Sequence, residues 1–87
     1  MLKEQEVAEK FSVMEVTFKD GKYEVRPISG LTDLSLEKAS LEKERLIDEA
    51  VNQAGNDALK LGLRPQEFTD YVKKAEYQAD QRYRVLK

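Results

Sequence analysis

The chain has 87 residues, of which 40% are hydrophobic and 37% are charged, and its formal net charge is −2 at pH 7. This length predicts one domain spanning residues 1–87, and so small a net charge argues against bulk electrostatic attraction to nucleic acid or to an anionic membrane. Cysteine and histidine are both absent, which excludes disulfides, thiolate nucleophiles and zinc–thiolate sites and removes the commonest general base at neutral pH.

The N-terminal segment, residues 2–11, could form a short helix, because Val7 and Phe11 lie four positions apart on one helical face. The first six residues contain no apolar segment typical of a secretory signal. No apolar run approaches the roughly 20 residues that a membrane-spanning helix needs. We therefore expect a soluble protein of the cytoplasm, or of the host cytoplasm or the virion if the protein is viral.

Residues 13–28 have the pattern of a β-hairpin. Apolar residues from Met14 to Phe18 alternate with polar ones, which is typical of a half-buried strand. Asp20-Gly21 follows, and this dipeptide favours the positive φ values of a two-residue hairpin turn. A turn there sorts apolar pairs to one face of the hairpin and an oppositely charged pair to the other. The predicted pairs are Phe18 with Tyr23, Val16 with Val25, Glu15 with Arg26, and Thr17 with Glu24.

Residues 35–61 are predicted to form one long helix. Apolar residues recur at helical spacing along this segment, and Asp33 or Ser35 can cap its first turn. The dipeptide Gly55-Asn56 is a weak point, because glycine costs about 1 kcal/mol in a helix interior. The apolar stripe stays in phase across it, so we expect a single helix, which could be kinked at residues 55–56, rather than two helices.

Gly62 and Pro65 predict a tight connection to a second helix over residues 65–86. Glycine is typical just after the end of a helix, and proline is typical of the first turn of the next one. So short a connection favours an antiparallel helical hairpin. The predicted fold class is therefore α+β, with one β-hairpin followed by a long antiparallel helical hairpin. Because two strands are not stable alone, either the β-hairpin packs across the helices or another chain completes the sheet.

The sequence offers little for catalysis. Glu44 and Asp48 share a helical face and could hold a divalent cation, but such a pair is more often a solvated acidic face. Lys43 falls within the apolar stripe, where a lysine is either fully buried or packs its stem and extends its ammonium group to water. We expect no enzymatic activity, no cofactor and no metal site.

Two leucines of the long helix indicate a binding surface. Leu41 and Leu59 lie on one line of the helix, nearly opposite its main apolar stripe. A helix that is apolar on two sides contacts two neighbours, although isolated surface leucines are also normal. Together with Phe18 and Tyr23 of the hairpin, these leucines are our candidate residues for binding a protein partner or a second copy of the chain.

The C-terminal helix offers a different candidate, a weak nucleic-acid-binding surface. Basic residues interleaved with tyrosine suit phosphate contacts and base stacking. However, Asp70 and Asp80 share this outer face, and six basic residues against four acidic ones give residues 64–87 a net charge of only +2. Basic residues in a last helical turn also simply complement the helix dipole. The candidate residues are Lys73, Lys74, Tyr77, Arg82 and Arg84.

The segment Val16–Ile28, followed by Gly30–Leu34, resembles the opening of the small tail assembly chaperones of tailed phages. In that family a strand, a Gly-Lys turn, a Tyr-bearing strand and an Arg-Pro pair lead into a helix. The resemblance implies a non-enzymatic protein that binds other virion or assembly components. We therefore expect a non-catalytic interaction module, such as a small assembly factor or structural component, with a protein partner or a homo-oligomer. Weak association with nucleic acid is the alternative.

Overall fold

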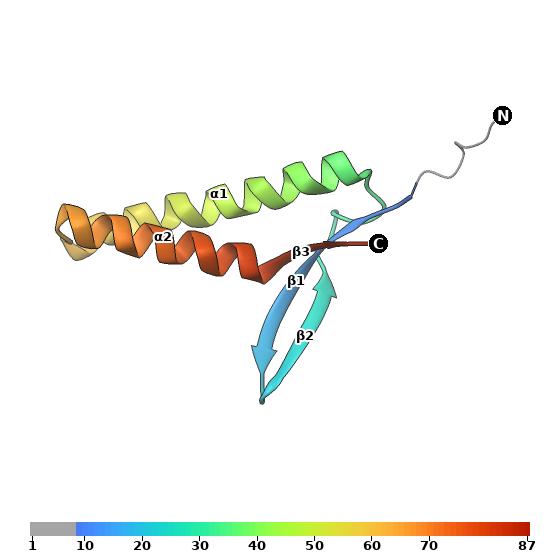
Figure 1. The fold of residues 1–87 in the computed structure, drawn as a ribbon, viewed down its shortest axis with the longest axis horizontal. Coiled ribbons are helices and arrows are strands. Elements are labelled where there is room, and N and C mark those ends of the chain that lie inside the picture. The colour runs from blue at the N-terminus through green and yellow to red at the C-terminus, as the bar shows by residue number, and fades with distance from the viewer. Residues whose placement is uncertain (1–8) are drawn as a thin grey trace.

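The computed structural model describes residues 9–87 and has the expected α+β fold (Figure 1). Two helices lie side by side as a helical hairpin, and a β-hairpin projects away from one end of that pair. A third strand continues from the second helix into the sheet. The elements are β1 (Ser12–Lys19), β2 (Lys22–Pro27), α1 (Leu36–Leu61), α2 (Pro65–Arg82) and β3 (Tyr83–Leu86).

The β-hairpin has the predicted turn and register. Asp20 and Gly21 form the turn with φ values of 54° and 76°, the positive values that a two-residue hairpin loop requires. All four predicted cross-strand pairs of β1 and β2 are present, including Phe18 with Tyr23. The sheet is antiparallel in the order β2-β1-β3, and β3 pairs with the first half of β1, from Ser12 with Leu86 onward. The chain thus completes its own sheet.

The first half of β1 is held firmly on both sides. On the side away from β3, the Val13 N–H donates to the Leu31 carbonyl at 2.8 Å, and the Val13 carbonyl accepts from the Ile28 N–H at 3.0 Å. Phe11 and Leu34 exchange two hydrogen bonds of 2.8 Å just before this point. Burial falls from here toward the turn: Val13 is fully buried, whereas the last three residues of β1 are exposed.

Helix α1 is continuous through Gly55, so residues 36–61 form one helix rather than two. Ser35, one of the two predicted caps, accepts a hydrogen bond from the Lys38 N–H at 3.1 Å through its Oγ. A Cβ at Gly55 would lie 3.8 Å from Cζ of Phe68 on α2, an ordinary contact. The helix ends at Gly62, whose φ of 69° is the left-handed conformation that favours glycine.

One sequence prediction was wrong. The helix expected over residues 65–86 begins at Pro65 as predicted but ends at Arg82, and Tyr83–Leu86 is strand β3. Strand pairing prevails because β1 offers backbone groups that need partners, and because Tyr83 and Val85 alternate with Arg84 in a strand-compatible pattern. The short helix expected over residues 2–11 is absent from residues 9–11, and its remainder lies outside the described residues.

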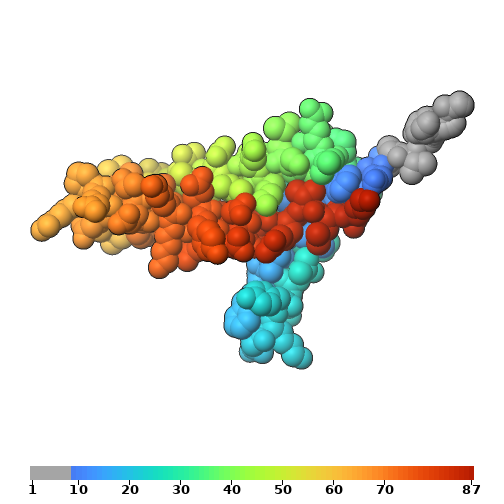
Figure 2. All heavy atoms as spheres, in the orientation of Figure 1, coloured from blue at the N-terminus to red at the C-terminus, as the bar shows by residue number. Residues whose placement is uncertain are grey.

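The hydrophobic core is thin. Among the described residues, the fully buried hydrophobic side chains are small, and only Val13 exceeds alanine in size. Alanines at the helix contact allow α1 and α2 to approach closely, but they bury little apolar surface per residue. Figure 2 shows the β-hairpin as a separate lobe beside the helical rod. The core residues are Val13, Ala39, Ala54, Ala58 and Ala79.

Candidate interaction surface

The most prominent apolar surface lies on one face of the β-hairpin. Val16 and Phe18 of β1 pair directly with Val25 and Tyr23 of β2, and alternation places all four side chains on the same face. We call these four residues the hairpin face. Phe18, Tyr23 and Val25 are 65%, 75% and 48% exposed. The rings of Phe18 and Tyr23 meet edge to face, with centroids 5.0 Å apart, so the two aromatic side chains hold each other in place.

A groove runs between the hairpin face and the end of α2. It has a volume of about 480 Å³, and its floor is formed by apolar residues of all three strands. Gln81 of α2 and Arg84 of β3 add polar groups at its margin. The groove can therefore hold an apolar side chain and present hydrogen-bond donors beside it. Its lining residues are Val16, Tyr23, Val25, Gln81, Arg84 and Leu86.

Sequence reasoning identified Phe18 and Tyr23 but missed Val25, Leu86, Gln81 and Arg84 as members of one surface. Val25 could have been included from the predicted register alone, because it pairs with Val16 on the same face. The residues from the C-terminal segment could be found only once β3 was recognised.

Leu41 and Leu59 are exposed, at 61% and 70%, but they do not form a common surface. They are about 27 Å apart at the helical rise of 1.5 Å per residue, and polar residues of α1 separate them. One of these is Arg45, which donates to Glu42 at 3.0 Å and to Glu49 at 2.6 Å. The hydrogen bond to Glu42 and the charges of both carboxylates raise the pKa of Arg45. Charged side chains therefore occupy this part of the helix.

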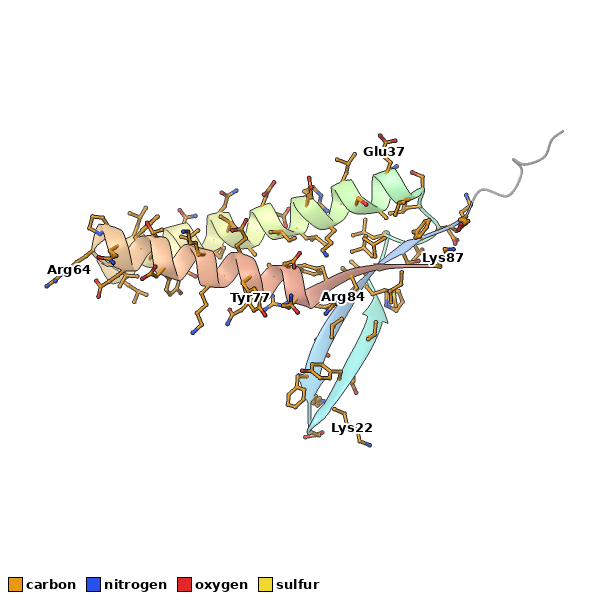
Figure 3. The ribbon with its side chains drawn as sticks, viewed as in Figure 1. Lys22, Glu37, Arg64, Tyr77, Arg84 and Lys87 are labelled. Atoms are coloured by element: carbon orange, nitrogen blue, oxygen red, sulfur yellow. The ribbon has the colours of Figure 1, made fainter. Side chains whose placement is uncertain are left out.

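The basic residues of the C-terminal segment lie on different surfaces. Lys73 and Tyr77 lie four residues apart on α2 and so share one face of the helix. Tyr77, labelled in Figure 3, is 66% exposed. Lys74 and Arg82 instead line a groove between α1 and α2. Arg84 belongs to β3 and lines the groove beside the hairpin face. The structure therefore does not bring the five predicted nucleic-acid residues together.

The charged groups weighed for catalysis lie at the surface. The Nζ of Lys43 is 3.4 Å from Oδ1 of Asp80, so its stem packs against the helix while its ammonium group pairs with α2. Within residues 9–87, no three Asp or Glu side chains are grouped so that they could hold a metal ion. Neither helix of this described part is long and apolar enough to cross a membrane.

Comparison with known proteins gives no relative. No family model, no curated protein and no solved structure matches this chain.

Proposed function

We propose that the chain is a non-catalytic protein–protein interaction module whose binding surface is the hairpin face. The observation that supports this is the exposure of Phe18, Tyr23 and Val25 as one contiguous apolar cluster on a projecting lobe. Burying a large apolar side chain contributes about 1.5–3 kcal/mol, so covering this cluster would provide substantial binding energy. Clustered aromatic residues are also typical of the centres of protein interfaces.

The proposed role is that of a small assembly factor or structural component of a larger complex. The thin core supports this role, because a partner that binds only the folded state adds to its stability. The resemblance to tail assembly chaperones of tailed phages supports it as well, since the segment Val16–Ile28 that bears the resemblance contains the whole hairpin face.

Site-specific photocrosslinking tests the proposal. A photoreactive phenylalanine analogue is placed at Phe18 in the full chain, in the cells that produce it, and a matched variant carries it at Leu59, which is equally exposed on α1. We expect a discrete crosslinked product from position 18 and none above background from position 59. Equal crosslinking at the two positions, or none at either, would overturn the proposal.

Weak binding of nucleic acid is a second candidate. Its support is the pair Lys73 and Tyr77, which combine a positive charge and an exposed ring on one face of α2. A gel-shift titration at low and high salt tests it, with Lys73→Gln as the variant. Absence of binding to single-stranded or double-stranded DNA or RNA at low salt would end this candidate.

A further inference from the structure

We propose that the outer edge of β2 pairs with the same edge of a second copy of the chain, as antiparallel strands with Val25 facing Val25. This inference rests on the proposed function and names a second copy of the chain as one partner, bound through the edge of the strand that carries Tyr23 and Val25 of the hairpin face. The two three-stranded sheets then form one continuous sheet of six strands, with both hairpin faces on the same side.

The edge of β2 is unoccupied within the described structure. Among the helices and strands of residues 9–87, β2 contacts β1 alone. The hydrogen bond from the Ile28 N–H to the Val13 carbonyl fixes which residues of β2 face β1. Because antiparallel strands alternate, Glu24 and Arg26 direct their backbone groups toward β1, and Tyr23, Val25 and Pro27 direct theirs outward.

The charges of β2 favour the register with Val25 facing Val25 over the one with Glu24 facing Glu24, and it pairs more of the strand than the register with Tyr23 facing Tyr23, in which only residues 22–24 overlap. With Val25 facing Val25, Glu24 of each copy lies opposite Arg26 of the other, so both cross-strand pairs are attractive. A register shifted to place Glu24 opposite Glu24 would also place Lys22 opposite Arg26, so all of its charged pairs repel. Glu24 and Arg26 already lie on one face of β2, with their side chains 3.3 Å apart and exposed.

The other face of the strand is also complementary to itself in this register. Val25 meets Val25, and Tyr23 of each copy lies over Pro27 of the other, so apolar side chains face each other. Two N–H groups from Val25 and two from Tyr23 can donate across the junction. Pro27 has no N–H and ends the ladder.

The symmetry of the contact makes it a closed dimer. An interface in which the same strand contributes from both copies uses up that edge, so it cannot add further copies. The opposite side of the sheet is formed by the four-residue strand β3 and the second half of β1, each of which is short for pairing. The charge pattern of β2 is matched by its own reversed sequence, which favours a second copy over an unrelated strand.

Charge reversal tests the register. The Glu24→Arg and Arg26→Glu variants of the full chain should each self-associate roughly tenfold more weakly than the original chain in sedimentation equilibrium at low salt. An equimolar mixture of the two variants should regain the dimer, because every cross-strand pair is again attractive. A chain that stays monomeric at high concentration, or variants that dimerise unchanged, would overturn the pairing.

Cysteine substitution tests the geometry, since the sequence contains no cysteine. Val25→Cys should form a disulfide-linked dimer under mild oxidation, because the two residues face each other across the axis. Tyr23→Cys is the matched control and should remain unlinked, because it faces Pro27. Equal linkage of both variants would contradict the register.

If Phe18 crosslinks to a different protein while the chain is monomeric, the pairing fails and the proposed function stands; if neither association occurs, both fail.

Discussion

The two halves of β1 differ in their surroundings although their sequences alternate in the same way. The first half is flanked by β3 on one side and by the segment from Ile28 to Leu34 on the other, and it contains the fully buried Val13. Within residues 9–87 the second half pairs with β2 alone, and it carries the exposed Phe18. The first half of the strand is therefore part of the core, and the second half carries the proposed binding surface.

The largest expected effect is on the free energy of unfolding, at Val13. Val13→Ala should lower it by about 2 kcal/mol, because it removes buried methyl groups and leaves a cavity. The matched Val25→Ala change in the exposed half should lower it by less than about 1 kcal/mol. Urea denaturation at low protein concentration measures both. Equal losses would show that the projecting half also stabilises the isolated fold.

Alanine substitution at Gly55 within α1 and at Gly62 just after it should change the free energy of unfolding in opposite directions. Gly55→Ala should raise the free energy of unfolding by about 0.5–1 kcal/mol, because the new Cβ makes only an ordinary contact with Phe68. Gly62→Ala should lower it by about 1 kcal/mol, because φ is 69° there. Thermal denaturation measures both. A loss at Gly55 would mean that α1 and α2 require closer packing than the structure shows.

The aromatic pair at the exposed end of the hairpin should contribute less to the free energy of unfolding than the buried Val13 does. A double-mutant cycle with Phe18→Ala and Tyr23→Ala should give a coupling energy of about 0.5–1 kcal/mol, since the rings meet edge to face. Chemical denaturation of the four proteins measures the coupling. A value near zero would indicate that the two rings are free of each other until a partner orders them.

The smallest effect on the free energy of unfolding is expected for the ion pair between Lys43 of α1 and Asp80 of α2. Asp80→Asn removes the partner of Lys43 and should lower the free energy of unfolding by about 0.5 kcal/mol, because the carboxylate is 54% exposed. The difference from the original chain should diminish in high salt. A difference that persists in high salt would assign the contribution to packing of the Lys43 stem.

The sequence was most informative where structure is decided locally. A two-residue turn fixes the register of the strands that flank it, so every pair of the hairpin followed from Asp20-Gly21. Ser35 likewise sets a helix boundary through its side-chain cap, and Gly62 and Pro65 do so through their backbone preferences. These predictions needed no knowledge of distant parts of the chain.

The sequence failed where distant residues decide. Tyr83–Leu86 fits a helical stripe as well as a strand, and its pairing with β1 near the other end of the chain tips the balance. Likewise, alternation identified an apolar face on the hairpin but could not tell that the helices leave it uncovered. Leu41 and Leu59 were predicted to lie opposite the main apolar stripe and to form a binding surface, but although both are exposed, polar residues between them prevent a common surface.

The pairing of Ser12 with Leu86 also has a kinetic consequence. The β1–β2 turn and the α1–α2 connection join neighbours in sequence and can form within microseconds. Pairing of β1 with β3 must instead close a loop that contains nearly all the described residues. The conformational entropy of this loop is lost before the β1–β3 contacts form and stabilise the chain. We expect this closure to limit the folding rate. The first half of β1 then remains unpaired on the β3 side until β3 forms.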